Sequence, residues 1–221
     1  ALGLALLLSL ISTLICLVLA YPLAMILSEK NMNQTSLIVL IFILPMWMNF
    51  LLRTLAWQTL LEKTGVINSV LRFLSLPTLD INTDAAIILG MVYNFLPLMI
   101  YPIYNTLQKL DKSYVEAAQD LGANPVQVFF KAVLPLSMPG IVSGILMVFM
   151  PTISTFAIAE LLTMNNIKLF GTTIQENINN SMWNYGAALS LIMLFLIGAT
   201  TLFASDDKGN DEGLSLIHIS E

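Results

Sequence analysis

The chain alternates between long apolar runs and short polar segments. A helix needs about 20 mostly apolar residues to span the hydrocarbon core of a bilayer, and five runs meet that length: 2–28, 36–61, 85–107, 137–162 and 185–204. Irregular backbone cannot face lipid, because lipid offers it no hydrogen-bond partner. The pattern therefore predicts an all-α, polytopic transmembrane bundle over 1–204, with short surface helices in the longer connections 62–84 and 163–184.

Composition supports a membrane protein. The chain is 57% hydrophobic and 10% charged, whereas a soluble domain carries about 25% charged residues. The formal net charge of −5 is concentrated in residues 206–221, where five acidic side chains stand against Lys208. Because the rest of the chain is nearly neutral, no nucleic-acid partner follows from the charge.

The two ends of the chain differ from its body. The first residues already belong to an apolar run with no charged segment before them, so we expect a truncated N-terminus and no cleavable signal peptide. Residues 205–221 form a polar tail, which we expect to be unstructured or a sequence artefact. His218 belongs to this tail and receives no role. Cys16 is the single cysteine, so no disulfide or thiolate metal cluster is available.

The polar segment 108–135 carries several helix signals. Ser113 followed by Glu116 has the spacing of a capping box, which predicts a helix that begins at Ser113. Gly122 suits a left-handed residue just beyond that helix. Asn124 can cap a second helix, with Pro125 in its first turn. The segment therefore predicts two short helices joined by a glycine turn.

The second of these helices is amphipathic. Val126, Phe129, Phe130 and Val133 recur at helical spacing and predict one apolar face. Pro135 either ends the helix or bends it into the next span. An alternative is an amphipathic connector on the membrane surface that has no partner.

Two further features of the apolar runs have structural and functional interpretations. Gly140 and Gly144 are small residues four apart, which favours close helix packing within the chain or between subunits over a role in a pore. Glu160 lies near the end of the fourth run. A carboxylate in apolar surroundings is costly, so Glu160 either contacts a cationic substrate on its path or reaches water at the membrane surface.

Aromatic and amide side chains gather in the second and third runs. They favour an aromatic belt at the membrane interface, and the alternative is a path on which aromatic faces meet an ammonium group. They are Trp47, Asn49, Arg53 and Trp57 in the second run and Tyr93 and Asn94 in the third.

Catalytic motifs are missing from the sequence. It contains no GxxxxGK[ST] phosphate loop, no HExxH, no CxxC and no GxSxG. We therefore predict that the chain is not an enzyme, does not hydrolyse ATP by that route, and needs no cofactor or metal.

Residues 116–135, EAAQDLGANPVQVFFKAVLP, resemble the cytoplasmic EAA loop of binding-protein-dependent ABC importer permeases, the MetI-like superfamily. Ala132 departs from this pattern, since the family usually has Ile there. Segments such as GMVYNFLPLMIYPIYNTLQKL and LPLSMPGIVSG resemble the spermidine/putrescine permeases in particular, and the MWMN-x-x-x-R stretch favours polyamines among the substrates. The residues that match the loop pattern are Glu116, Ala117, Ala118, Gly122, Leu134 and Pro135.

The resemblance implies a function and a set of partners. The chain would be a multi-pass permease subunit of the bacterial cytoplasmic membrane, paired with a second permease subunit and supplied by an extracytoplasmic polyamine-binding protein. Its loop 108–135 would dock on a dimer of ATP-binding subunits, with Glu116 at the docking site. The Lys and Arg counts on the two sides hardly differ, so the orientation follows from the resemblance alone. Such permeases usually have six spans, so the first would precede residue 1.

Two alternatives remain open. One is a permease of the same superfamily for iron or another small solute. The other is an ion-coupled secondary transporter or a membrane scaffold, neither of which needs a loop that docks on an ATPase.

Overall fold

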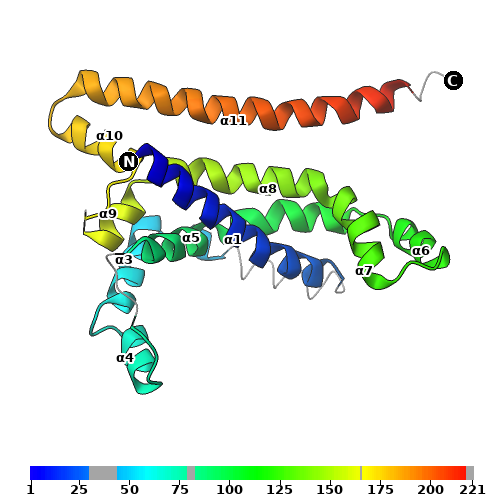
Figure 1. Ribbon diagram of the computed structural model, residues 1–221, viewed down its shortest axis with the longest axis horizontal. Helices are drawn as coiled ribbons and strands as arrows, with labels where there is room; N and C mark the ends of the chain where they lie inside the picture. The colour runs from blue at the N-terminus through cyan, green and yellow to red at the C-terminus, as the bar shows by residue number, and fades with distance from the viewer. Residues whose placement is uncertain (30–43, 79–82, 165, 218–221) are drawn as a thin grey trace.

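The protein is a bundle of helices joined by short connections (Figure 1). The computed structural model describes residues 1–29, 44–78, 83–164 and 166–217. The predicted all-α fold is confirmed. The elements in chain order are α1 (Leu2–Glu29), the 3-10 turn η1 (Leu44–Trp47), α3 (Phe50–Leu61), α4 (Val66–Phe73), α5 (Asp84–Gln108), α6 (Lys112–Asp120), α7 (Pro125–Val128), the π turn η2 (Phe129–Val133), α8 (Leu134–Ser154), α9 (Ala157–Thr163), α10 (Phe170–Asn179) and α11 (Trp183–Ile217).

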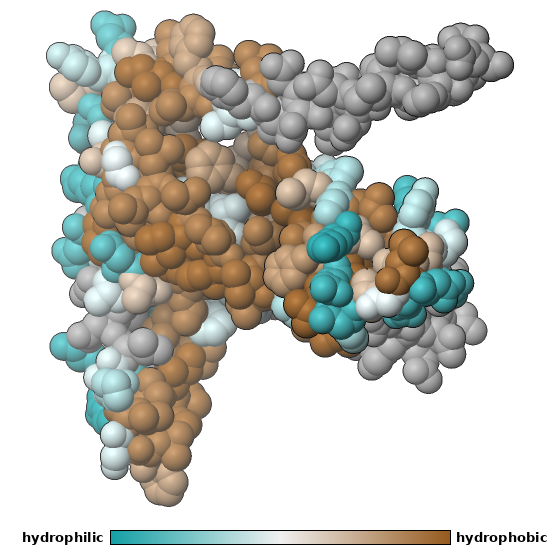
Figure 2. Space-filling model, turned by 45° about the vertical axis from the view of Figure 1, so that its right-hand side comes forward, coloured by the Kyte–Doolittle hydropathy of each residue, from teal (hydrophilic) through white to brown (hydrophobic). Residues whose placement is uncertain are grey.

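Four helical segments among the described residues are long and apolar enough to cross a membrane: Leu2–Ser28, Asp84–Gln108, Pro125–Ser154 and Trp183–Leu202. Apolar side chains cover the middle of the bundle, whereas hydrophilic ones gather along one end and over the α6–α7 end (Figure 2). α1, α5 and α8 form the packed centre, and α11 lies beside α8, with few of the side chains of its segment Trp183–Leu202 buried. This division into an apolar middle and two polar ends is the one that a bilayer requires.

The predicted span 36–61 differs from the structure in its described part. η1 and α3 are separate, because the backbone leaves helical geometry at Met48 and Asn49. The Asn49 side chain caps α3, accepting hydrogen bonds from the backbone N–H of Leu51 (2.9 Å) and of Leu52 (3.4 Å). Asparagine is a strong N-cap residue, so it starts a new helix inside an apolar run. Residues 36–43 of this predicted span lie outside the described residues.

The predicted span 137–162 is also divided. α8 ends at Ser154, Thr155 has extended backbone geometry (φ −66°, ψ 134°), and α9 starts at Ala157. Hydropathy does not detect this break, because Thr155 and Phe156 leave the run apolar. The division places α9 and α10 at the end of the bundle opposite α6 (Figure 1).

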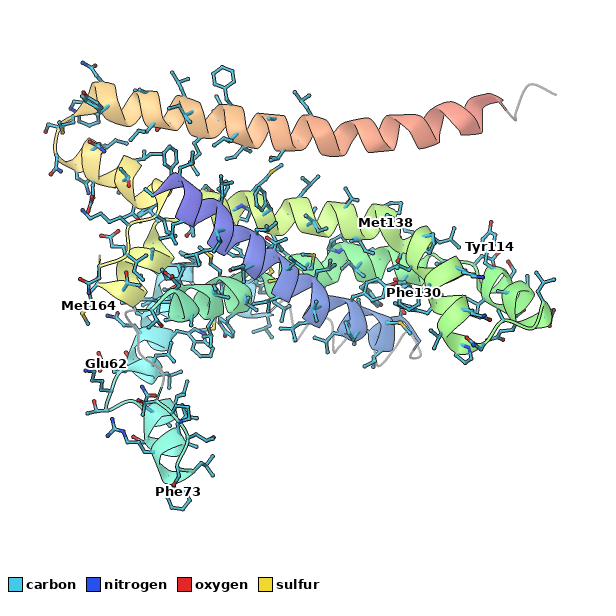
Figure 3. The ribbon with its side chains drawn as sticks, viewed as in Figure 1. Glu62, Phe73, Tyr114, Phe130, Met138 and Met164 are labelled. Carbon is cyan, nitrogen blue, oxygen red and sulfur yellow. The ribbon has the colours of Figure 1, made fainter. Side chains whose placement is uncertain are left out.

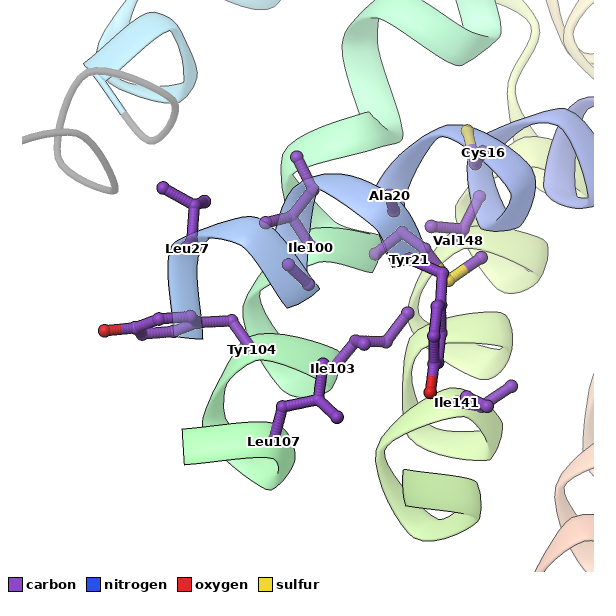
Figure 4. Close-up of a cluster of buried hydrophobic side chains, with 12 residues drawn as sticks. Cys16, Ala20, Tyr21, Leu27, Ile100, Ile103, Tyr104, Leu107, Ile141 and Val148 are labelled. Carbon is purple, nitrogen blue, oxygen red and sulfur yellow. The ribbon is translucent and has the colours of Figure 1, made fainter. Parts of the chain in front are cut away.

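Small residues let the central helices approach closely. Cys16, Ala20 and Ala24 follow each other at four-residue spacing on α1 and are fully buried. They belong to a core cluster with side chains of α5 and α8, among them Ile103 and Val148 (Figure 4). A stripe of small side chains brings two backbones together and increases their van der Waals contact, which drives helix association in membranes. A second cluster, near α9 and α10, includes Leu8, Ile87, Met91, Ile158 and Leu162.

The polar tail departs from the expectation of an unstructured segment. α11 extends to Ile217, so the backbone of 205–217 is helical. No proline interrupts the chain from Trp183 to Ile217, so no residue in it removes a backbone N–H from the helix. Residues 218–221, with His218, lie outside the described residues.

Candidate coupling loop and transport path

The first helix of the loop begins earlier than predicted. Its N-cap is Asp111 rather than Ser113, and the Asp111 carboxylate accepts a hydrogen bond from the backbone N–H of Ser113 at 3.0 Å. This hydrogen bond favours the ionised form and holds the pKa of Asp111 below its ordinary value. Because Asp111 caps the helix, Glu116 is not needed for a capping box with Ser113, and Glu116 lies exposed on α6.

The turn between the two loop helices has the predicted form. Gly122 is in the left-handed region (φ +82°) and donates its N–H to the carbonyl of Gln119 at 2.8 Å. Asn124 then caps α7 in a complete capping box: its side chain accepts from the N–H of Gln127 (2.8 Å), and the Gln127 side chain accepts from the N–H of Asn124 (3.0 Å). The turn is thus held by its own backbone and caps.

The second loop helix continues into the membrane span. α7, η2 and α8 form one helical segment, so Pro135 does not end it. Proline lacks the N–H that would bond to the carbonyl of Lys131. The backbone widens to a π turn just before it, in which the N–H of Leu134 bonds to the carbonyl of Phe129.

The π turn fixes the loop to two spans. The ring of Phe129 meets the ring of Tyr21 on α1 edge to face, with centroids 5.6 Å apart. The Tyr21 hydroxyl lies 2.9 Å from the hydroxyl of Ser137 on α8, a hydrogen-bond distance. Both Tyr21 and Ser137 are buried. Any displacement of Phe129 therefore acts directly on α1 and α8.

The apolar residues of the second helix do not share one face, in contrast to the prediction. Phe129 and Val133 pack against the central core, whereas Val126 and Phe130 point outward. The π turn changes the residue period between these positions, which divides a stripe that α-helical spacing would keep together. Tyr114 and Leu121 are further exposed apolar side chains of the loop, and Figure 3 labels Tyr114 and Phe130.

The matched loop residues occupy different environments. Glu116, Ala117, Gly122 and Pro135 are exposed, and Ala118 and Leu134 are half-buried. A cavity of about 340 Å³ separates α6 from the last turn of α1. Val115 lines it on the α6 side and Met25 on the α1 side. The exposed residues thus project from a helix that touches the bundle mainly through the π turn.

The two glycines of α8 lie against α5. A Cβ atom at Gly140 would stand 2.5 Å from the Thr106 hydroxyl oxygen and 2.9 Å from the Pro102 carbonyl oxygen. At Gly144 it would stand 2.7 Å from the Met99 sulfur. Both positions therefore form a seam inside this chain, where only glycine fits without a shift.

Of the aromatic and amide candidates and Arg53, the structure brings together three. The rings of Trp57 and Tyr93 lie 5.0 Å apart, and the guanidinium carbon of Arg53 lies 5.8 Å from the Tyr93 ring centroid. This is the geometry of a cation–π contact. Trp47 is 82% exposed and stands apart from them, at the end of η1.

The remaining amides have structural roles of their own. Asn49 caps α3, as described above. Asn94 is buried and donates its side-chain N–H to the carbonyl of Gly90 at 2.8 Å. Its side-chain oxygen has no partner among the described residues. A buried acceptor without a donor is costly.

Glu160 lies on α9 beside a polar cavity of about 330 Å³ between α9 and α10. Across this cavity Lys168 forms an ion pair with Glu176, with the ammonium nitrogen 2.8 Å from the carboxylate oxygen. The sequence indicated Glu160 but not its neighbours. Lys168 and Glu176 are eight residues apart, on the two sides of the start of α10, so no helical spacing connects them. No group of three metal-ligating side chains occurs in the described parts of the chain.

The arrangement of these helices is that of ABC importer permeases. Two solved structures share this fold. One is a bacterial ABC transporter that imports the acidic polysaccharide alginate, with a TM-score of 0.75, 16% sequence identity, and coverage of 95% of this chain and 78% of the other. The second is the bacterial alginate ABC transporter in complex with an alginate-bound periplasmic protein, with a TM-score of 0.70, 17% identity, and coverage of 92% and 75%.

The sequence comparison defines the family. Residues 2–205 match the model of the binding-protein-dependent transport system inner membrane component, and the chain belongs to this family. It is 39% identical to the spermidine/putrescine transport system permease protein PotB of Haemophilus influenzae, over 88% of this chain and 67% of that protein. It is 36% identical to PotB of Escherichia coli, over 88% and 72%. The chain is thus a multi-pass membrane protein and a permease of the ABC importer type.

Proposed function

We propose that this chain is a permease subunit of an ATP-driven polyamine importer in the bacterial inner membrane. It forms the translocation path together with a second permease subunit, and an extracytoplasmic binding protein delivers spermidine or putrescine. The relatives that are 36–39% identical are named as spermidine/putrescine permeases, and this supports polyamines as the substrate. The alginate transporters share the fold but not the sequence, so they do not bear on the substrate.

The loop 108–135 carries the coupling role in this proposal. It faces the cytoplasm and docks on a dimer of ATP-binding subunits, which hydrolyse the ATP. The observation that supports this role is the construction of the loop. Its caps and its glycine turn fix its shape, its outer surface presents apolar side chains beside Glu116, and Phe129 connects it to α1.

A rigid element of this kind can transmit closure of the ATPase dimer. The two states must differ in their contacts if one subunit is to shift the equilibrium of another. When the loop moves, Phe129 pushes on Tyr21 of α1. The loop also moves α8 directly, because the helical segment continues from the loop through Leu134, the first residue of α8. Two central helices then change position together, which opens or closes the path between the permease subunits.

The test combines two loop substitutions in the complete transporter. Glu116→Ala removes the exposed carboxylate. Gly122→Val places a branched side chain in left-handed backbone, at a cost of about 1–2 kcal/mol. We expect the double variant to lose ATP-dependent uptake of labelled putrescine while it still inserts into the membrane. Gly198→Val on α11 is the matched control, because a Cβ there meets nothing within 4 Å.

Unchanged uptake by the double variant would reject the coupling role of the loop. A separate comparison tests the substrate: uptake of labelled putrescine, spermidine and ferric iron by the same wild-type complex. Iron uptake without polyamine uptake would leave the permease class intact and reject the polyamine assignment.

A further inference from the structure

A polar cavity lies between α9 and α10, at the end of the bundle opposite α6 (Figure 1). It has a volume of about 330 Å³. Each side chain that lines it is charged or can form hydrogen bonds. They are Glu160, Lys168, Thr172, Gln175, Glu176, Asn179 and Asn180.

The charges of this cavity do not balance. Glu160 and Glu176 supply two carboxylates, and Lys168 supplies one ammonium group. Lys168 pairs with Glu176 at 2.8 Å, while 54% of the Lys168 side chain remains exposed. A partly exposed ion pair contributes only about 0.2–1 kcal/mol, so Lys168 can leave its partner at a small cost.

Thr172 provides an independent indication of a ligand. It is only 1% exposed, and its hydroxyl oxygen has no hydrogen-bond partner among the described residues. Its neighbour Thr173 instead donates to the carbonyl of Leu169 at 3.0 Å, the usual arrangement for a threonine in a helix. A buried hydroxyl without a partner costs about 1–3 kcal/mol. Thr172, which lines the cavity, therefore has a hydroxyl group that is available for a hydrogen bond to a ligand.

The group already held in the cavity has a specific chemistry. The side chain of lysine is a four-carbon alkyl chain that ends in a primary ammonium group. Putrescine and the butyl arm of spermidine end in the same unit. Carboxylates, amide oxygens and a hydroxyl supply the acceptors that the three donors of a primary ammonium group require.

We propose that this cavity is a binding site for a primary alkylammonium group, and that Lys168 occupies the site when no ligand is present. The ligand's ammonium group takes the place of Lys168 beside Glu176, and the Lys168 side chain turns into solvent. The charge of the cavity stays the same during this exchange. Binding is therefore weak and reversible, as a site on a translocation path requires. The identity of the ligand as a polyamine rests on the proposed function; the ammonium site itself does not.

The experiment measures binding to the assembled transporter in nanodiscs, without the binding protein, by calorimetry with butylammonium chloride as the probe. Lys168→Met removes the competing ammonium group and should tighten binding about two- to fivefold, the range expected for release from a partly exposed ion pair. Glu176→Gln removes the carboxylate and should weaken binding by a similar factor. Lys63→Met is the matched control, since Lys63 does not line the cavity, and should leave binding unchanged.

Opposite shifts in Lys168→Met and Glu176→Gln are the result expected if Lys168 competes with the ligand for Glu176. If Lys168→Met instead weakens binding or leaves it unchanged, Lys168 is not a substitute ligand and the proposal fails. Competition by NaCl or MgCl₂ as strong as that by butylammonium, at equal ionic strength, would show a generic cation site and overturn the alkylammonium assignment. Thermal unfolding of each variant separates loss of structure from loss of binding.

Polyamine uptake by the wild-type transporter, measured in parallel, keeps the two proposals distinguishable. Absent uptake with intact butylammonium binding counts against the proposed function and not against the site. Normal uptake with no effect of Lys168→Met or Glu176→Gln on binding counts against the site alone.

Discussion

The two ends of the bundle are built for different kinds of contact. At the α6–α7 end, caps and a left-handed glycine hold the backbone, and large apolar side chains such as Leu121 and Phe130 project outward. At the α9–α10 end, a polar cavity contains the Lys168–Glu176 ion pair and the unpartnered hydroxyl of Thr172. A loop with a fixed backbone and exposed apolar side chains suits a protein partner, because burying those side chains releases free energy and little backbone ordering is needed. A polar cavity with a partly exposed ion pair suits a small ligand that must leave again.

α8 connects the two ends. It continues from the π turn of the loop as far as Ser154, three residues before α9 begins. Its glycines lie against α5, so α8 cannot move without either sliding along this seam or carrying α5 with it. The seam therefore ties any movement of α8 to α5.

The largest effect is expected from widening this seam. Gly140→Val brings a side chain against the Pro102 carbonyl, a backbone atom that cannot turn aside. Overpacking of this kind costs about 1–3 kcal/mol, and we expect a clear fall in the thermal stability of the purified transporter. Gly198→Val, where the added atoms meet open space, should unfold at the wild-type temperature. Equal stability of the two variants would show that α8 is not held against α5.

A smaller effect is expected where the loop meets α1. Tyr21→Leu removes both the edge-to-face contact with Phe129 and the hydrogen bond to Ser137. We expect ATP hydrolysis to continue with less putrescine taken up per ATP, because the loop then moves without α1. Tyr21→Phe keeps the ring and loses only a hydrogen bond, worth about 0.6 kcal/mol inside a membrane protein, so it should retain most of the coupling. Uptake per ATP measured on both variants gives the comparison, and equal values for Tyr21→Leu and wild type would remove Tyr21 from the pathway.

The difference between the two ends also explains what the sequence could predict. The loop depends on local signals: Gly122, Asn124 and Pro125 each act within a few residues, and the structure has each of them in the predicted place. The cap at Asp111 shows the limit of this approach, since Ser113 and Asp111 are both good caps and only the backbone selects one. The single apolar face predicted for the second loop helix was wrong because the π turn before Pro135 changes the helical period.

The α9–α10 end depends on contacts that the sequence does not encode locally. Glu160, Lys168 and Thr172 lie on different segments, and they share a cavity only because α8 stops at Ser154 and the chain turns back. The break after Ser154 lies within one apolar run, so hydropathy predicts a single span there. The stripe of Cys16, Ala20 and Ala24 was not predicted from the sequence, and its partners on α5 come from residues about 80 positions away along the chain.

A small effect is expected for the ion pair of the polar end. A double-mutant cycle with Lys168→Met and Glu176→Gln should give a coupling free energy of unfolding of less than about 1 kcal/mol, because the pair is partly exposed. The same cycle measured at high salt should give a still smaller value. A coupling free energy of several kcal/mol would mean that Lys168 is held firmly beside Glu176. That result would contradict the proposal that a ligand displaces Lys168.

The smallest and most local effect is expected at the N-cap of α6. Asp111→Ala removes the acceptor for the N–H of Ser113, whereas Asp111→Asn keeps one. We expect faster hydrogen exchange at Ser113 and Tyr114 in the alanine variant, near wild-type exchange in the asparagine variant, and no change in the α9–α10 segment.

The lowered pKa of Asp111 also predicts how the protection of the Ser113 amide changes with pH. A carboxyl group whose pKa is lower in the folded state stabilises that state above its ordinary pKa, and this contribution is lost as the pH falls through the lowered value. Protection of the Ser113 amide should therefore be constant near neutral pH and should decrease only in acid, after correction for intrinsic exchange. Asp111→Asn cannot titrate, so its protection should not show that decrease. An identical acid response in wild type and Asp111→Asn would show that the Asp111 carboxylate does not hold the first turn of the loop, and the rigidity that separates this end from the other would then depend on Gly122 and Asn124 alone.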